Sequence, residues 1–364
     1  MRVKLEDVCE RGSSNLKQSD VIDKTGEYPI YGASGYLGNV DFYHQEKSYV
    51  AVVKDGAGIG RTTLHPAKSS VIGTMQYLLP KENVLPEYLC YVVRYMHLEK
   101  YFTGATIPHI YFKDYKNEEF NLDTLERQKE IVDILKKVAN IIDSRQQELQ
   151  KLDDLIKARF VELFGVPDVN SMCWDEKPLS EYLDVVGGYA FKSDSFLDEG
   201  IPVLRIGNIN AGHFKPINMV YWEDDSNLER YKMFPGDLVM SLTGTVGKDD
   251  YGNVCILGAD YGKYYLNQRN AKLELKQGLN KYYLSHLLKF EQIKKRLTGI
   301  SRGVRQANIS NKDIMDLSVP IPPMELQEQF ASFVSQVDKS KVAVQKALDE
   351  AQLLFDSLMQ KYFG

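Results

Sequence analysis

The fold of this chain is decided by a stretch of sequence that occurs twice. Residues 125–165 read LERQKEIVDILKKVANIIDSRQQELQKLDDLIKARFVELFG, and residues 324–364 read MELQEQFASFVSQVDKSKVAVQKALDEAQLLFDSLMQKYFG. The two stretches align without a gap over 41 positions, at an offset of 199 residues. Their apolar patterns coincide, and the identical pairs are Glu126/Glu325, Gln128/Gln327, Val138/Val337, Gln146/Gln345, Leu149/Leu348, Leu155/Leu354, Phe164/Phe363 and Gly165/Gly364. So long a period indicates that a domain was duplicated together with a helix, and it excludes a solenoid.

Each copy has apolar residues at heptad spacing, which predicts one long helix. In the first copy these residues are Leu135, Ile142, Leu149, Ile156 and Leu163, interleaved with Ile131, Val138 and Leu152. In the second copy they are Val334, Leu348, Phe355 and Tyr362, interleaved with Phe330, Val337, Val344, Ala351 and Leu358. At 1.5 Å per residue, each helix is expected to be about 60 Å long, which suits a rod. We expect the two apolar stripes to pair.

The ends of both helices have recognisable signals. Asp123 is expected to cap the first helix with Glu126 at the third helical position, and Gly165 followed by Pro167 to end it. Pro322-Pro323 marks the start of the second helix.

Charged residues interrupt the heptad pattern near the middle of each helix. They are Arg145 in the first copy and Lys341 in the second, with a further exception at Arg159. One interpretation is that these long side chains reach out of the seam into water. The alternative is that Arg145 and Lys341 form a docking surface for another subunit.

Two globular segments, 1–120 and 177–318, form a second duplicated pair. Matching runs occur in the same order in both, such as 28–32 against 201–207, 54–60 against 242–248, and 85–89 against 279–284. Short β-type runs lie at 49–53 and 238–242. We therefore expect an α+β fold with a pseudo-two-fold internal repeat, in which two α/β domains are separated by two long antiparallel helices that form a coiled coil. The segments are 1–120 (first domain), 121–165 (central helix), 166–176 (linker), 177–318 (second domain) and 319–364 (C-terminal helix).

Composition excludes several classes of protein. The chain has 364 residues with 43% hydrophobic and 26% charged, no run of eighteen apolar residues and a charged start without a signal-peptide core. Its four cysteines lie far apart without a CxxC pair, which argues against a zinc site or a disulfide framework. We expect a cytoplasmic protein without a membrane partner.

The net charge of −5 conceals a local basic segment. Residues 281–312 carry eight Lys or Arg against the single acid Glu291. A helix with Lys294, Lys295 and Arg296 is expected to meet phosphates, and a loop with Arg302, Arg305 and Gln306 to meet base edges. A solvated charged face is the alternative.

Motifs for catalysis are incomplete. The run 243–249 resembles a phosphate-binding loop, but Asp249 stands where Ser or Thr must reach magnesium. The run 56–61 has Arg61 in place of the third glycine of a dinucleotide fingerprint. No Asn-Pro-Pro-Tyr or Asp-Pro-Pro-Tyr segment is present, and the six histidines are scattered. We expect no catalytic centre and no metal site.

Several motifs in the second half of the chain resemble one family. They are Gly187-Gly188-Tyr189-Ala190-Phe191-Lys192-Ser193, Pro202-Val203-Leu204-Arg205-Ile206-Gly207-Asn208-Ile209, Gly236-Asp237-Leu238-Val239, Leu266-Asn267-Gln268-Arg269 and Ile321-Pro322-Pro323-Met324-Glu325-Leu326-Gln327. Their order, with the doubled plan, resembles the specificity subunit of type I DNA restriction-modification systems over nearly the whole chain. The first domain departs from this pattern, because Gly12-Ser13-Ser14 stands opposite the first motif and 106–110 replaces the arginine-rich loop.

The resemblance implies a non-catalytic subunit whose two target recognition domains each bind one half of a split, asymmetric sequence in double-stranded DNA. Two methyltransferase (M) subunits and restriction (R) subunits would be its partners, and S-adenosylmethionine, ATP and Mg would reside on them, with no cofactor in this chain. We expect the half-sites to lie about 34 Å apart, one helical turn of DNA. The alternative functions are a structural adaptor that binds proteins through its β-rich domains and, third, a stand-alone nuclease or methylase.

The candidate DNA-binding residues follow from these arguments. In the first domain they are Ser34, Tyr36, Lys54, Arg61, His109, Tyr111 and Lys113. In the second domain they are Tyr189, Lys192, Arg205, Asn208, Thr243, Thr245, Lys248, Arg269, Lys294, Lys295, Arg302, Arg305 and Gln306. Arg145 and Lys341 are the candidate subunit contacts.

Overall fold

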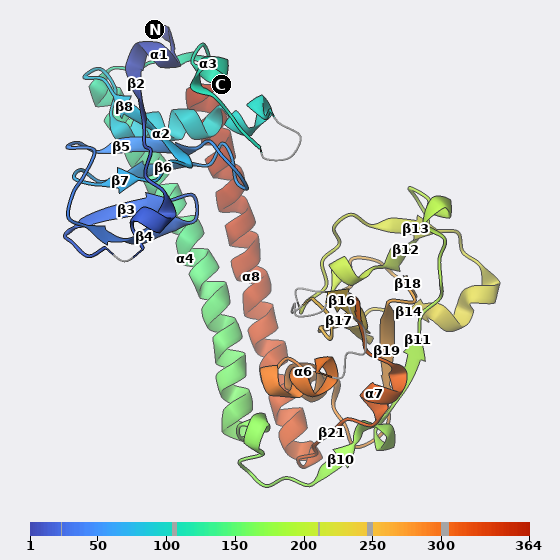
Figure 1. The fold of residues 1–364 in the computed structure, drawn as a ribbon. Coiled ribbons are helices and arrows are strands. Elements are labelled where there is room, and N and C mark those ends of the chain that lie inside the picture. Colours follow the sequence, from blue (N-terminus) through green and yellow to red (C-terminus); the bar gives the residue numbers. More distant parts are fainter. Residues whose placement is uncertain (23, 104–107, 210–211, 246–249, 300–305) are drawn as a thin grey trace. The chain divides into compact units, whose positions relative to one another are not determined.

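The computed structural model describes the chain except residues 23, 104–107, 210–211, 246–249 and 300–305 (Figure 1). The chain divides into two compact units. Unit 1 consists of Met1–Glu148 and Val344–Gly364, and unit 2 consists of Leu149–Ala343. Each unit therefore contains part of both long helices.

The two long helices are confirmed. They are α4 (Leu125–Phe164) and α8 (Met324–Phe363), each of 40 residues. In unit 1 the Arg127 guanidinium near the start of α4 lies 5.8 Å from the Tyr362 ring near the end of α8. In unit 2 the rings of Phe160 and Phe330, near the end of α4 and the start of α8, are 5.3 Å apart. Within each unit, the two helical segments are therefore antiparallel.

The cap of α4 differs from the expectation by one residue. The backbone N–H of Arg127 donates to the Thr124 hydroxyl at 3.4 Å, so Thr124 and not Asp123 is the capping residue. Asp123 is engaged elsewhere, because its carboxylate accepts the hydroxyl of Tyr88 at 3.0 Å. At the other end of α4, Gly165 adopts φ +79, as expected for a residue that ends a helix.

Unit 1 contains two main sheets. One has the order β2-β8-β5-β6 and is antiparallel, and the other has the order β4-β3-β7, in which β3 and β7 are parallel. Strands β1 and β9 form a separate pair. The strands are β1 (Arg2–Lys4), β2 (Cys9–Ser13), β3 (Tyr28–Gly32), β4 (Gly35–Val40), β5 (Tyr49–Val53), β6 (Thr62–His65), β7 (Ser70–Val71), β8 (Met75–Pro80) and β9 (Glu119–Asn121). The short helices are α1 (Leu5–Val8), η1 (Gln18–Asp20), α2 (Pro86–Tyr95), η2 (Leu98–Tyr101) and α3 (Phe112–Tyr115).

Unit 2 repeats this topology. One sheet has the order β11-β19-β15-β17, and the other has the order β13-β12-β18-β14 with β12 and β18 parallel. Pairs β10-β21 and β16-β20 complete it. The strands are β10 (Glu176–Pro178), β11 (Leu183–Gly187), β12 (Ile201–Leu204), β13 (Val220–Trp222), β14 (Lys232–Met233), β15 (Leu238–Ser241), β16 (Thr243–Thr245), β17 (Val254–Ile256), β18 (Tyr264–Leu266), β19 (Asn270–Leu275), β20 (Gln306–Asn308) and β21 (Ser318–Pro320). The helices are η3 (Pro167–Val169), η4 (Leu179–Glu181), η5 (Ser193–Ser195), η6 (Ile206–Asn208), η7 (Ser226–Tyr231), α5 (Lys281–Leu287), α6 (Glu291–Thr298) and α7 (Asn311–Met315).

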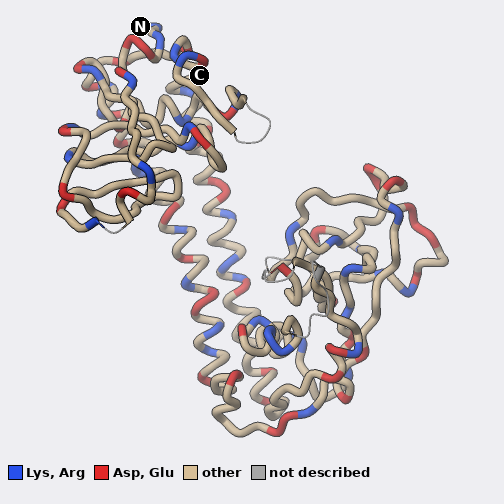
Figure 2. Tube along the Cα trace, in the orientation of Figure 1, with Lys and Arg blue, Asp and Glu red and all other residues tan. Residues whose placement is uncertain are grey.

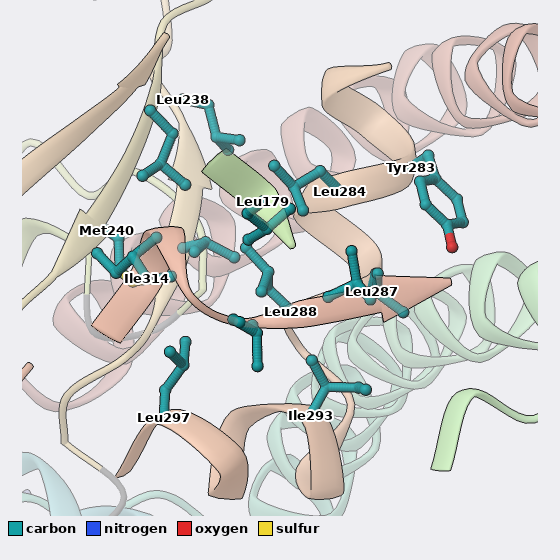
Figure 3. Close-up of a cluster of buried hydrophobic side chains, with 14 of the residues drawn as sticks. Leu179, Leu238, Met240, Tyr283, Leu284, Leu287, Leu288, Ile293, Leu297 and Ile314 are labelled. Atoms are coloured by element: carbon teal, nitrogen blue, oxygen red, sulfur yellow. The ribbon is translucent and has the colours of Figure 1, made fainter. Parts of the chain in front are cut away.

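The core of each unit joins its sheet to the long helices. In unit 2 the buried cluster runs from β15 through α5 and α6 to α4 and α8 (Figure 3). The Tyr283 ring of α5 meets Phe164 of α4 edge-on at 4.7 Å. In unit 1 the Tyr88 ring of α2 meets Phe363 of α8 edge-on at 5.3 Å. The same tyrosine–phenylalanine contact therefore fastens a long helix to the domain in both units.

Candidate nucleic-acid interface

Unit 2 has a pocket of about 510 Å³ at the carboxyl ends of the parallel strands β12 and β18. The chain leaves β12 at Arg205 and β18 at Asn267, and both segments line the pocket. Three of the expected residues line it, namely Arg205, Asn208 and Arg269. The pocket walls also include the aromatic side chains of Phe191 and Phe196. The structure thus brings together two arginines that lie 64 positions apart in the sequence.

The two arginines differ in their surroundings. The Arg205 guanidinium donates to the carbonyl oxygen of Asn218, which anchors it to the rim of the pocket. Arg269 is exposed, and in the described part of the chain its guanidinium has no hydrogen-bond partner, although its backbone N–H donates to the Asn267 side chain at 3.2 Å. Its neighbour Gln268, which the sequence argument did not select, is exposed beside it. Arg269 and Gln268 are free to bind a ligand.

Asn208 has a structural role. Its side chain is 2% exposed, and its amide donates to the carbonyl oxygens of Lys215 at 3.0 Å and Ile217 at 2.9 Å. Its Oδ1 accepts the backbone N–H of Arg205 at 2.9 Å. Because these bonds use the donors and acceptor of the amide, Asn208 shapes the loop that carries Arg205, and the expected base contact by Asn208 itself is not available in this arrangement.

Lys294 and Lys295 of α6 point to different environments, although both were expected to meet phosphate. Lys294 is 8% exposed, and its ammonium donates to the Asn253 side chain at 2.7 Å inside unit 2. The expectation of an exposed cation at Lys294 is therefore wrong, because the inner face of α6 is buried. Lys295 is exposed and pairs with Glu291 at 2.5 Å. Figure 2 shows Lys and Arg gathered along α6.

The remaining expected residues of unit 2 are not among those that line the pocket, and three of them lie outside the described residues. Tyr189 is 37% exposed and its ring meets the Phe191 ring edge-on at 5.0 Å. Lys192, the next residue after Phe191, is exposed. Thr243 and Thr245 lie on β16, which pairs with β20. Gln306 is described only by its backbone, as the partner of Thr245. Lys248, Arg302 and Arg305 lie outside the described residues.

Unit 1 also has a pocket at the carboxyl ends of its parallel strands. It measures about 360 Å³, and the segments that follow β3 and β7 line it through Gly32, Ser34 and Thr74. Arg61 enters from a different loop and donates to the carbonyl oxygen of Ala33 at 3.0 Å. Tyr36, 62% exposed, lies beyond this rim. Two expected residues, Ser34 and Arg61, are therefore brought together.

The other expected residues of unit 1 form a second cluster around a carboxylate. Asp55, which the sequence argument missed, pairs with Lys54 and accepts from His109 Nδ1 at 2.6 Å. The Tyr111 ring is stacked on the His109 ring at 6.3 Å, and the Lys113 ammonium lies 5.4 Å from the Tyr111 ring. Only the pairing of the two backbones, at Asp55 and His109, could have revealed the carboxylate.

Two tyrosines, one in each unit, have pKa values raised above the ordinary value of a phenol. Burial, followed by repulsion from the Tyr36 ring, raises the pKa of Tyr31 at the end of β3. Burial also raises the pKa of Tyr251, whose hydroxyl donates to the carbonyl oxygen of Thr298 at 2.8 Å.

The two charged residues that interrupt the heptad lie on the long helices. Arg145 pairs with Glu148 on its own helix at 2.5 Å, and its side chain is 43% exposed. The Lys341 ammonium lies 2.6 Å from an Asp153 carboxylate oxygen, which links α8 to α4 within unit 2. Lys341 thus has a partner within the unit, whereas Arg145 has only a local one among the described residues.

The chain matches the family described as the type I restriction modification DNA specificity domain at residues 1–154 and 173–351. It therefore belongs to this family, and it is a specificity subunit: a non-catalytic, DNA-recognition component of a type I restriction-modification system.

Relatives with known names agree with this assignment. The type I restriction enzyme MjaVIII specificity subunit of Methanocaldococcus jannaschii is 26% identical over 331 residues, which cover 82% of this chain and 76% of that protein. The EcoKI specificity subunit of Escherichia coli is 24% identical over 183 residues, 46% of this chain and 38% of that protein. Among solved structures, the type I restriction-modification S subunit from M. genitalium shares the fold with a TM-score of 0.62 and 16% identity, over 100% of this chain and 96% of that one.

The described residues contain neither a metal site nor a membrane-spanning helix. No three His, Cys, Asp or Glu side chains there come together as a metal site. In the same part of the chain, no helix is both long enough and apolar enough to cross a lipid bilayer.

Proposed function

We propose that the two units recognise the two halves of a split, asymmetric DNA sequence. The observation that carries this proposal is that the units share the order of their first sheet and the parallel pair of their second sheet, but have different side chains in their pockets. Segments 1–120 and 177–318 act as the two target recognition domains. Because the pockets of the two target recognition domains (the two heads) have different side chains, the two half-sites differ in sequence. Because each head belongs to a separate unit, the bases between the half-sites are not read.

The helices set the distance between the half-sites. Helices α4 and α8 each run without a break from one unit into the other, and each begins and ends in a domain core. A helix is stiff along its axis, and each residue adds 1.5 Å. Paired as a coiled coil, residues 121–165 and 319–364 act as the spacer between the two heads.

The chemistry belongs to partner subunits. Two M subunits bind along the spacer, with Arg145 and Lys341 as contacts, and they methylate adenine in each half-site with S-adenosylmethionine. R subunits, with ATP and Mg, cut unmodified DNA. A chain in one of the solved structures of similar fold, with a TM-score of 0.51 and 15% identity over 100% of this chain and 97% of that one, comes from work on "complex assembly" and "conformational transition" of the type I restriction-modification system. This chain contributes no cofactor, and it acts in the cytoplasm, where its DNA target is found.

The spacer can be tested by shortening both helices by one heptad. Residues 146–152 and 342–348 are removed together, which leaves Arg145 and Lys341 in place, so that both helices lose the same two turns and the heptad register is kept. The shortened chain is expressed with its M subunits, and methylated adenines are mapped across the cellular DNA. We expect the letters of both half-sites to persist while the number of bases between them changes.

Two results would contradict the proposal. New letters with the old spacing would show that the helices do not set the distance. If the intact chain and its M subunits methylate no split sequence at all, the DNA-reading role of the two units fails, and the protein-binding adaptor becomes the better interpretation. Matched unpaired deletions, in α4 alone and in α8 alone, serve as controls that break the register.

A further inference from the structure

The two pockets occupy the same place in the two units. In unit 1 the parallel pairing places Tyr31 of β3 beside Val71 of β7. In unit 2 it places Leu204 of β12 beside Leu266 of β18. Each pocket begins at the residues that follow these pairs. Gly32 is therefore the structural equivalent of Arg205.

Backbone hydrogen bonds extend the equivalence along the second segment. The N–H of Met75 donates to the Ile72 carbonyl at 3.0 Å, and that of Asn270 to the Asn267 carbonyl at 2.9 Å. The N–H of the residue that follows the central strand then donates to the next segment: Lys54 to Thr74 at 3.0 Å, and Leu242 to Arg269 at 2.8 Å. Thr74 and Arg269 are therefore equivalent positions.

A third position completes the comparison. The N–H of Val53 donates to the Arg61 carbonyl at 2.9 Å, and that of Ser241 to the Asn253 carbonyl at 2.9 Å. Arg61 of unit 1 is thus equivalent to Asn253 of unit 2. Arg61 lines the pocket, whereas the Asn253 side chain is turned to the ammonium of Lys294.

The two pockets thus have the same backbone arrangement, but their arginines stand at different positions. Unit 2 carries arginine at 205 and 269 and asparagine at 253, and unit 1 carries glycine, threonine and arginine at the equivalent positions. A side chain at the first of these would crowd its neighbours in unit 1, because a Cβ on Gly32 would lie 3.0 Å from Leu37 Cδ1 and 3.1 Å from Ile72 Cδ1. The positive charge of the unit 1 pocket therefore comes from Arg61, at the position equivalent to Asn253 of unit 2.

We infer that these two pockets are the base-reading sites of the two heads, and that Gln268 and Arg269 in unit 2 and Arg61 in unit 1 determine which bases each half-site contains. The inference rests on the proposed function and adds the residues and their ligand, the base edges of double-stranded DNA. A purely structural role would keep the side chains of Gln268 and Arg269 bonded to protein. Arg269 and Gln268 instead are exposed and, in the described part of the chain, lack side-chain partners. Arg61 is exposed and keeps one such bond, from Nη1 to the Ala33 carbonyl oxygen at 3.0 Å, so its Nε and Nη2 edge is the part that would meet a base.

The chemistry of the two side chains indicates the bases. A guanidinium fork donates two parallel hydrogen bonds to O6 and N7 of guanine, and a carboxamide pairs in the same way with N6 and N7 of adenine. The adjacent Gln268 and Arg269 thus suit a neighbouring adenine and guanine in the half-site of unit 2. In unit 1, Arg61 suits a guanine.

The test uses point variants of the full chain, expressed with its M subunits and assayed by mapping methylated adenines. Arg269→Ala should lower discrimination at one base of one half-site by about tenfold, with the other half-site and the spacing unchanged. Gln268→Ala should relax a base next to it. Arg61→Asn, which installs the residue found at the equivalent place in unit 2, should relax the other half-site only.

Conservative variants and controls separate recognition from folding. Arg269→Lys keeps the charge and loses the fork, so it should lose the base preference while retaining overall DNA affinity. It keeps the test valid if Arg269→Ala fails to fold. Arg230→Ala, on the Tyr231 ring of unit 2 and outside the pocket, should leave every letter unchanged.

Three outcomes would overturn the inference. They are unchanged letters in all the pocket variants, a relaxation that spreads over both half-sites from a single variant, and a uniform loss of affinity with all letters intact, which would assign the arginines to phosphate. In each case the unaltered chain still directs its M subunits to methylate a split sequence, so the proposed function stands. Failure of the intact chain itself would instead remove the proposed function.

Discussion

Gln128 and Gln327 lie 199 residues apart in the sequence, and each makes the same three hydrogen bonds inside its own unit. Each Oε1 accepts the backbone N–H of the residue just before a domain helix. In unit 1 this is Leu85, before α2, at 2.9 Å, and in unit 2 it is Asn280, before α5, at 2.8 Å. Each amide nitrogen donates to two carbonyl oxygens. Both side chains are 0% exposed, so they join the start of a long helix to its domain without water.

Replacing either glutamine by alanine should therefore destabilise its own unit. The change leaves a buried N–H and buried carbonyl groups without partners, and we expect the free energy of unfolding of that unit to fall by about 2–4 kcal/mol. Denaturant unfolding followed by hydrogen exchange would assign the loss to one unit. Gln345→Ala, at an exposed position of α8, is the matched control and should change stability by less than about 0.5 kcal/mol. An unchanged unfolding midpoint for Gln327→Ala would contradict the structural role.

Replacing Lys294 should affect the stability of unit 2, whereas replacing Lys295 should affect DNA binding. Lys295→Ala removes an exposed cation from α6, so it should weaken binding to all DNA sequences and reduce the slope of log affinity against log salt by about one. Lys294→Ala removes the ammonium that bonds Asn253, so it should lower the thermal midpoint of unit 2. Fluorescence anisotropy at several salt concentrations and thermal unfolding would check both. Equal salt slopes for the two variants would count against the assignment.

Arg145 and Lys341 should affect assembly more than stability if they contact partner subunits. Both side chains lie partly in water, so their replacement by alanine should change the unfolding free energy by less than about 1 kcal/mol. Sedimentation of the chain with its M subunits would show weaker association of the double variant. Asp153→Ala also breaks the Lys341 pair but leaves both cations, and it is the control. Unaltered assembly of the double variant would make the two residues tolerated polar positions on the helices.

Acidification should destabilise unit 1 through His65. This imidazole is buried against the rings of Tyr31 and Tyr49, and burial lowers its pKa to about 4. In the unfolded chain its pKa is near 6.5, so the unfolded state binds a proton more readily between these values. The stabilisation is complete above about pH 6.5 and is lost as the pH falls toward 4, by about 1–2 kcal/mol between pH 7 and pH 5.

Urea unfolding of unit 1 at a series of pH values measures this dependence. His65→Gln should reduce the fall in unfolding free energy between pH 7 and pH 5 (the acid limb), whereas His97→Gln, at an exposed position, should leave this fall unchanged. The same acid limb in the His65 variant would show that other groups cause it.

The long helices could be predicted from the sequence because a heptad depends only on neighbouring residues. The cap at Thr124 could not, since the hydroxyl that occupies Asp123 comes from Tyr88, 35 residues earlier. Lys294 was misplaced for a similar reason, because its charge suggests exposure and only the packing of α6 turns it toward Asn253.

The two candidate sites could not be predicted without knowing which distant strands pair. Arg205 and Arg269 were selected one by one from separate motifs, but the parallel pairing of Leu204 with Leu266 is what places them in one pocket. Asp55 carries no motif, and its place beside His109 follows from a bridge between chain segments 54 residues apart. Local patterns therefore indicate which residues are candidates, and long-range register decides how they are combined.

Unit 1 is assembled from the first and last parts of the chain, and this has a consequence for its synthesis. Met359 and Phe363 belong to its core, together with residues from β1 to α4. The ribosome translates all of unit 2 before it reaches these residues. Unit 2 can therefore fold from a contiguous stretch of chain, while the apolar surface of unit 1 that Met359 and Phe363 will cover is still exposed. Exposed apolar surface of this kind on a nascent polypeptide is what molecular chaperones bind.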